Sequence, residues 1–308
     1  MRSDHPLFAE YPLDAVVPVD GEDCTSPYHI YNGDLVLIGG RADAAAAADL
    51  LAGERLAPML DSAGNALMAV WLADFTEANL GPHHELQISL FAALTPQPPT
   101  PQHPFAIHRL LLLEPDAYMV CHGLWNSTQR VVRYNQSHLC LDARLSNSRI
   151  DRDDRRGMRS AEQTMRSRHD SATADLMPIP PQWNFQVSDA LSGQAVAEGS
   201  LALPNRQPLS VSWAMLRHLG MAGMMQSARQ PFIHVPVVNT KSAYADDNYV
   251  AHTYTRSDRQ IIRRREKADA VSIRHQRYAP LNFQPDFVQH SAGVRFVYLR
   301  PQPLDAAV

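Results

Sequence analysis

A tight turn that leads into an alternating run, within residues 73–92, constrains the fold more than any other stretch of the chain. Gly81 and Pro82 mark the turn, because glycine tolerates unusual backbone angles and proline presets φ. In a strand, successive side chains point to opposite faces. The run after the turn therefore predicts a strand whose polar face carries Glu85, Gln87 and Ser89 and whose apolar face carries Leu86, Ile88 and Leu90. We expect the chemistry of the protein on the polar face.

Short segments with strand character recur along the chain and outnumber the helical ones. Helices are expected over 42–57, which is rich in alanine, and over the Met-rich segment 213–225, which would fill the core or wall an apolar pocket. Many strands with few helices indicate an α+β fold around an antiparallel, barrel-like sheet. The predicted strands are 34–38, 66–75, 139–145, 183–187, 195–203, 232–239, 270–278 and 295–299.

Charge and composition give no sign of a nucleic-acid or membrane partner. The formal net charge of −4 gives no general attraction to nucleic acid or to anionic lipid. No window reaches about 18 consecutive apolar residues, and the N-terminus lacks an apolar signal core. The three cysteines form neither a CxxC pair nor a zinc-finger spacing. We therefore expect a cytoplasmic protein whose partner is a small-molecule substrate.

Residues 146–177 differ from the rest of the chain because arginine and aspartate crowd into a mostly polar segment. Such mixed charge is typical of an exposed insertion supported by nearby opposite charges. A loop of this kind can also cover an acidic substrate. Both interpretations stay open at this point.

The turn and strand around Glu85 resemble a segment of the acetoacetate decarboxylase-like superfamily, in which a Gly-rich turn precedes a glutamate that lines the active-site cavity. On that resemblance Glu85 is the family glutamate. Segment 31–43 resembles the early strand and the start of its following helix, and segments 279–282 and 294–299 resemble the C-terminal part. The resemblance covers most of the chain. It implies a single domain over 1–308, a cone-like sheet with a few flanking helices, and a possible homo-oligomer.

Residues 114–130 resemble the family segment that ends in two adjacent lysines, but the last two positions here are Gln129 and Arg130. In the decarboxylases one lysine forms a Schiff base, and its positive neighbour lowers its pKa. Glutamine cannot form a Schiff base, and arginine stays protonated. The family arginine that assists the substrate carboxylate would fall near Gly33. The resemblance thus implies a shared scaffold, with a helix over 117–125, but without the decarboxylase chemistry.

Three residues form the predicted catalytic set. Glu85 would carry the proton, because a carboxyl group in an enclosed apolar cavity has a raised pKa. Arg130 would hold a carboxylate or an enolate through its planar donors, and His84 would assist as an acid or base. A salt-bridged structural glutamate, a structural arginine and a hydrogen-bonded loop histidine remain the alternatives.

The predicted substrate-binding residues are Gln129, His83, His122 and Trp125. A metal site at the histidine pair would need a third ligand, such as His122 or His138, and we predict no metal. The chain has no GxGxxG and no P-loop, so no nucleotide motif is present and no cofactor is predicted.

These features predict an acetoacetate decarboxylase-like enzyme that works without a Schiff base. It would act by acid/base chemistry on a small keto acid, keto ester or related carbonyl compound, as a lyase, dehydratase, cyclase or hydrolase, and secondary metabolism is the expected setting. A non-catalytic small-molecule binding protein that uses the same cavity is the first alternative. The second is a decarboxylase that uses Lys241, which with Lys267 makes up the whole lysine content of the chain.

Overall fold

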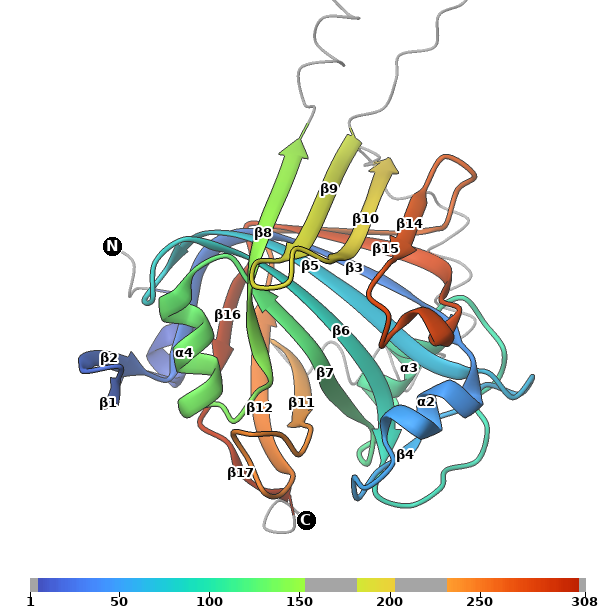
Figure 1. The fold of residues 1–308 in the computed structure, drawn as a ribbon, viewed down its shortest axis with the longest axis horizontal. Coiled ribbons are helices and arrows are strands. Elements are labelled where there is room, and N and C mark those ends of the chain that lie inside the picture. Colours follow the sequence, from blue (N-terminus) through green and yellow to red (C-terminus); the bar gives the residue numbers. More distant parts are fainter. Residues whose placement is uncertain (1–4, 153–181, 203–231, 305–308) are drawn as a thin grey trace, which may run out of the picture.

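The computed structural model describes residues 5–152, 182–202 and 232–304. Strands dominate this part of the chain, and the helices are short (Figure 1). None of the helices in these three ranges is long and apolar enough to cross a membrane. The helices are α1 (Pro6–Glu10), α2 (Ala44–Leu50), α3 (Ala106–Leu113) and α4 (Gln129–Ser137), with a 3-10 turn η1 (Ala279–Leu281).

Seven strands pair side by side in a ring. Their order is β7, β11, β12, β16, β3, β5 and β6, and β6 pairs with β7 again. The pairings in this ring are antiparallel except β7 with β11. The bounds are β3 (Tyr28–Ala42), β5 (Ala66–Ala78), β6 (His83–Ala93), β7 (Tyr118–Asn126), β11 (Ile233–Asn239), β12 (Tyr249–Arg256) and β16 (Arg295–Tyr298).

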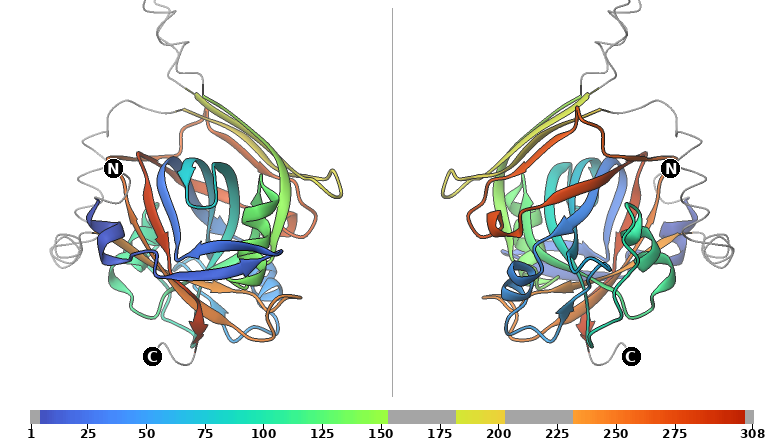
Figure 2. Two further views of the ribbon diagram at one scale, coloured as in Figure 1. Left: turned by 90° about the vertical axis from the view of Figure 1, so that its left-hand side faces the viewer. Right: turned by 90° about the vertical axis from the view of Figure 1, so that its right-hand side faces the viewer.

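A second group of strands extends from the ring and lies beside it as a separate layer, which we call the outer sheet (Figure 2). It consists of β8 (Ala143–Arg152), β9 (Gln182–Asp189), β10 (Ala195–Ala202) and β14 (Ala270–Ile273). The remaining strands are β1 (Ala15–Val19), β2 (Glu22–Ser26), β4 (Ala57–Pro58), β13 (Arg259–Arg264), β15 (Gln284–Ala292) and β17 (Gln302–Pro303).

The described residues form two large hydrophobic cores and a smaller cluster around Leu7 and Phe8 of α1. The inner core lies within the ring and includes side chains of α3 and α4, such as Ile107 and Val131. The outer core lies between the ring and the outer sheet and includes Trp183 and Phe185 of β9. The strand-rich α+β fold predicted from the sequence is therefore confirmed.

Strand β6 has the two faces that its alternation predicts. Leu86, Ile88 and Leu90 all belong to the outer core. Gln87 donates to Ser89 at 2.7 Å, so these polar side chains share the opposite face with Glu85. The polar face of β6 looks into the ring.

Strand β7 occupies the place where the resemblance implied a helix over 117–125, so that prediction is wrong. All of its residues are buried. A strand covered on both faces shows no alternation, and periodicity cannot distinguish it from a buried helix. A bulge also interrupts β7: Ile88 pairs with Gly123 and Ser89 pairs with Cys121, which leaves His122 as the extra residue.

Several predicted boundaries shift. Helix α2 begins after Asp43, whose carboxylate accepts from Ala46 N at 2.9 Å, but it ends at Leu50 and does not continue to residue 57. The strands predicted over 139–145 and 270–278 are β8, which starts at Ala143, and β14, which ends at Ile273. The other predicted strands are confirmed, with differences at their ends.

Two predicted segments fall largely outside the described residues. The Met-rich segment 213–225 lies entirely outside them. Of the charged segment 146–177, residues 146–152 form part of β8 and the rest is not described.

Gly39 provides a test of the packing within the ring. It pairs with Phe287 across β3 and β15, and a methyl group on Gly39 would overlap the Phe287 ring. We expect Gly39→Ala to lower the free energy of unfolding by about 1 to 3 kcal/mol, measured by urea denaturation. The cost should shrink in a Phe287→Leu background, where the ring is gone. An equal cost in both backgrounds would contradict this account of the contact.

Candidate active site

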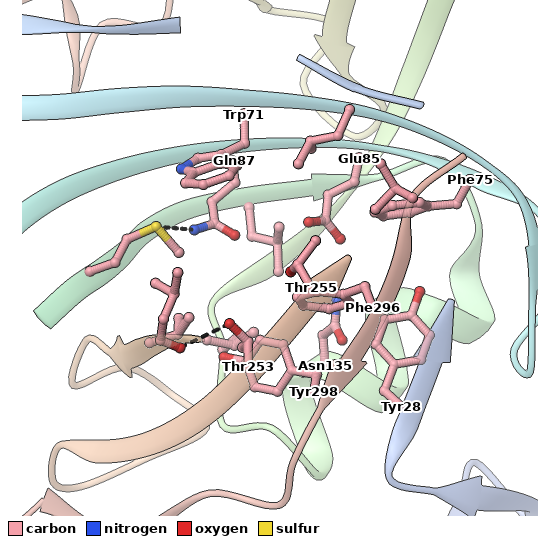
Figure 3. A pocket seen from close by; sticks show the side chains of 17 residues that line it. Tyr28, Trp71, Phe75, Glu85, Gln87, Asn135, Thr253, Thr255, Phe296 and Tyr298 are labelled. Carbon is pink, nitrogen blue, oxygen red and sulfur yellow. Dashed lines mark hydrogen bonds between the residues drawn. The ribbon is translucent and has the colours of Figure 1, made fainter. Parts of the chain in front are cut away.

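Side chains from all around the ring enclose a small cavity, with about 70 Å³ open to the centres of water-sized molecules (Figure 3). No lysine, arginine or histidine is among its described lining residues. The apolar lining residues are Leu35, Trp71, Phe75, Met119, Leu124, Leu141, Val235, Val237, Val294 and Phe296. The polar ones are Tyr28, Glu85, Gln87, Asn135, Thr253, Thr255 and Tyr298.

Glu85 is the acidic residue of this cavity, and its carboxyl group points into it (Figure 3). Burial raises the pKa of Glu85 to about 7, and a hydrogen bond from Asn126 opposes that rise. The protonated and ionised forms are therefore both populated near neutral pH. Such a group can accept a proton and also return one.

Two amides hold the Glu85 carboxyl group from one side. Asn126, opposite Glu85 in the β6–β7 register, donates from Nδ2 to Glu85 Oε2 at 2.9 Å. Asn135 of α4 donates in turn to Asn126 Oδ1 at 3.0 Å. No other hydrogen bond from a described residue reaches this carboxyl group. The second carboxyl oxygen is left for the cavity.

Tyr28 and His83 form a second polar unit beside the cavity. His83 Nδ1 lies 2.9 Å from the carbonyl oxygen of Gly81, which can only accept, so Nδ1 carries the hydrogen. His83 Nε2, 2.6 Å from Tyr28 Oη, is then the acceptor of the Tyr28 hydroxyl. Burial lowers the pKa of His83 to about 4, which keeps this neutral form at physiological pH. The predicted substrate-binding residue His83 does not line the cavity itself but contacts two residues that do, Tyr28 and Phe75.

The other predicted histidines and Trp125 lie on the outer side of the ring. His84 is partly exposed, and its Nδ1 lies 3.0 Å from Ser148 Oγ. His122 contacts Tyr278 Oη at 3.1 Å, on the same side of β7 as Val120 of the outer core. Trp125 donates to Asp189 at 3.2 Å in the outer core. None of these three side chains lines the cavity.

Gln129 and Arg130 are exposed on the first turn of α4. Arg130 Nε lies 3.7 Å from the Glu22 carboxylate, at the surface. The face of α4 that meets the ring carries Asn135 instead. The structure therefore does not bring Arg130 and Gln129 to Glu85.

Both lysines are exposed as well. Lys241 follows β11, and its Nζ lies 3.9 Å from an Asp247 carboxylate oxygen. Lys267 lies just before β14 of the outer sheet. Neither lysine reaches the cavity that Glu85 lines. Among the described residues there is also no group of three or more side chains that could hold a metal ion.

Sequence reasoning missed Asn126, Asn135 and Tyr28. Asn126 left a signal, because an amide at the end of a buried apolar strand needs a polar partner. Tyr28 and Asn135 left none, because they reach Glu85 only through the ring closure and the orientation of α4.

The raised pKa of Glu85 makes a stability prediction. The carboxyl group titrates at about 7 in the folded protein, above its ordinary 4.5, so ionisation opposes folding at high pH. This penalty disappears as the pH falls from about 7 to below 4.5. We expect Glu85→Gln to gain stability over the wild type between pH 4.5 and pH 8, by roughly 3 kcal/mol at most, measured by urea denaturation. The exposed control Glu114→Gln should show no such trend, and a pH-independent difference at Glu85 would refute the raised pKa.

Comparisons with known proteins bear on the fold. No protein-family model matches the sequence, and the comparison with curated proteins found no relative. The structure is similar to the acetoacetate decarboxylase of Legionella pneumophila, with a TM-score of 0.52, 9% identity and coverage of 97% of this chain and 94% of that chain. A second acetoacetate decarboxylase structure matches with a TM-score of 0.50, 9% identity and coverage of 91% and 89%. The chain has the acetoacetate decarboxylase-like fold that its sequence predicted.

Proposed function

We propose that the protein is an enzyme that moves protons to and from a small carbonyl compound in the inner cavity, with Glu85 as the acid and base. The observation that supports this most is the Glu85 carboxyl group, whose pKa of about 7 comes from burial in an apolar cavity. An acid or base works best when its pKa lies near the operating pH. A structural glutamate would be expected to have a cationic partner, and none acts on Glu85 among the described residues.

The proposed mechanism uses no Schiff base. Both lysines are exposed and away from the cavity, so no lysine amine is placed to attack a bound carbonyl carbon. We assign activation of the carbonyl group to hydrogen bonds from the cavity wall.

The central step is proton transfer next to the carbonyl. The ionised Glu85 carboxylate takes a proton from the carbon beside the carbonyl, and the electron pair of that C–H bond moves to form an enolate. Protonated Glu85 then returns the proton to the same carbon or to a leaving group. Lyase, dehydratase and cyclase reactions share this step, and the fold likeness leaves the reaction type open.

A binding protein that uses the same cavity is the second candidate function. It is favoured because the described lining residues include no second group that titrates near neutral pH. Burial raises the pKa of both Tyr28 and Tyr298 well above 10. Ligand binding without proton transfer would establish this function instead.

Exchange of carbon-bound hydrogen tests the enzyme proposal. Wild-type protein should accelerate deuterium incorporation beside the carbonyl of 2-butanone or pyruvate in D₂O, followed by proton NMR. The rate should rise with pH through about 7 as Glu85 ionises. Glu85→Gln should lose about 10²- to 10⁴-fold of this rate, whereas Glu114→Gln should keep it.

Two results would contradict the proposal. One is an unchanged exchange rate in Glu85→Gln. The other is an adduct trapped on Lys241 or Lys267 by borohydride added during exchange, which would contradict only the absence of a Schiff base. We expect borohydride to leave the protein mass unchanged.

A substitution of Asn126 tests how its hydrogen bond affects the pKa of Glu85. Its hydrogen bond lowers the pKa of Glu85, so Asn126→Ala should move the midpoint of the pH–rate profile above 7. Asn147→Ala, at an exposed position of β8, is the matched control and should leave the midpoint in place. A loss of rate with no shift in midpoint would indicate a purely structural role for Asn126.

A further inference from the structure

The ionisable groups that line the inner cavity are all acids. They are Glu85, Tyr28 and Tyr298, and each becomes negative when it loses a proton. The described lining contains no group that becomes positive. A substrate carboxylate would find no counter-ion there and would lie beside the Glu85 carboxyl group.

The two arginines of α4 do not compensate. Arg130 is exposed and lies 3.7 Å from Glu22, and Arg133 lies 3.1 Å from Asp20. Neither affects the pKa of Glu85, which burial and Asn126 control. An unpaired charge in an apolar site is destabilising, and two like charges side by side are more so. The cavity therefore selects against an anion.

Two residues of the cavity lining each carry a buried hydrogen-bond donor without a partner. Trp71 Nε1 and Tyr298 Oη are buried and have no hydrogen-bond partner in the described structure. Tyr298 is only 6% exposed. A buried donor without a partner opposes stability, and a ligand that reached it with a carbonyl oxygen would satisfy it.

Asn135 carries an acceptor that needs a hydrogen-bond donor. Its Oδ1 is a buried acceptor with no partner, while its Nδ2 is engaged by Asn126. An anion offers only acceptors and cannot satisfy this oxygen. An uncharged compound that interconverts between a carbonyl and an enol form offers both an acceptor and a donor.

We propose that the ligand of this cavity is an uncharged small carbonyl compound, such as a ketone, aldehyde or ester, and not a keto acid. This inference rests on the proposed function for the presence of a carbonyl group. The volume of about 70 Å³ restricts the ligand to about five to seven non-hydrogen atoms, because one water already needs about 10 to 15 Å³.

Two probes of nearly equal shape test the charge preference. 2,4-Pentanedione and acetoacetate differ by a methyl group in place of a carboxylate oxygen. We expect the diketone to bind the wild-type protein at least about tenfold more tightly at pH 8, measured by isothermal titration calorimetry. In Glu85→Gln the difference in affinity between the diketone and acetoacetate should become smaller. Equal or tighter binding of acetoacetate, or no binding of either probe, would overturn the inference.

Tyr298→Phe tests the unpartnered donor. Because this hydroxyl group has no partner in the described structure, its removal should leave the melting temperature unchanged or higher, yet weaken diketone binding several-fold. Tyr244→Phe, at an exposed tyrosine, is the matched control and should change neither quantity. A fall in melting temperature with unchanged binding would show that Tyr298 acts structurally and overturn its assignment.

The exchange assay separates the two proposals. Exchange on pyruvate that exceeds exchange on 2-butanone would overturn the uncharged-ligand inference and leave proton transfer by Glu85 intact. Selective diketone binding with no exchange on any carbonyl compound would support the ligand class and reject the enzyme.

Discussion

Strand β7 has two edges but pairs with three strands. The arrangement of the molecule depends on how these three strands share the two edges. One edge pairs with β6, while Met119–Cys121 on the other edge pair with β11 and Leu124–Asn126 pair with β8. The bulge at His122 lies at the change of partner. Because of this division one strand belongs to both the ring and the outer sheet, and the polar ends of β6 and β7 meet inside the ring.

In the cavity that results, the Glu85 carboxyl group adds nothing to the stability of the fold. Ionised Glu85 has no counter-ion among the described residues, and Trp71 and Tyr298 leave donors unpaired beside it. Each of these features opposes stability, while the surrounding inner core favours it. Several destabilising features gathered in one place are typical of a binding site or an active site.

The sequence predicted the parts of the site that depend on local pattern. The turn at Gly81 and the alternation after it placed Glu85 on the polar face of a strand, and the resemblance implied that this face lines a cavity. Arg130 was predicted from a position in a resemblance, but the side chains that α4 turns toward the ring depend on how the helix packs, which pattern alone does not encode. His122 was misplaced because the resemblance implied a helix over 117–125, and a strand buried on both faces has no alternation that would show which side chains face the cavity. Tyr28 could not be predicted, because only the tertiary fold brings it to Glu85.

The hydrogen bonds that hold the Glu85 carboxyl group determine how its pKa responds to ionic strength. Asn126 and Asn135 are neutral amides, and the pKa of Glu85 depends on enclosure and hydrogen bonding, with no charge–charge contribution from the described residues. Dissolved salt screens interactions between charges, and the partly buried Glu85 has no charged partner among the described residues. The proton affinity of this carboxyl group should thus stay nearly constant as ionic strength changes, whereas the surface pairs of Arg130 and Arg133 weaken.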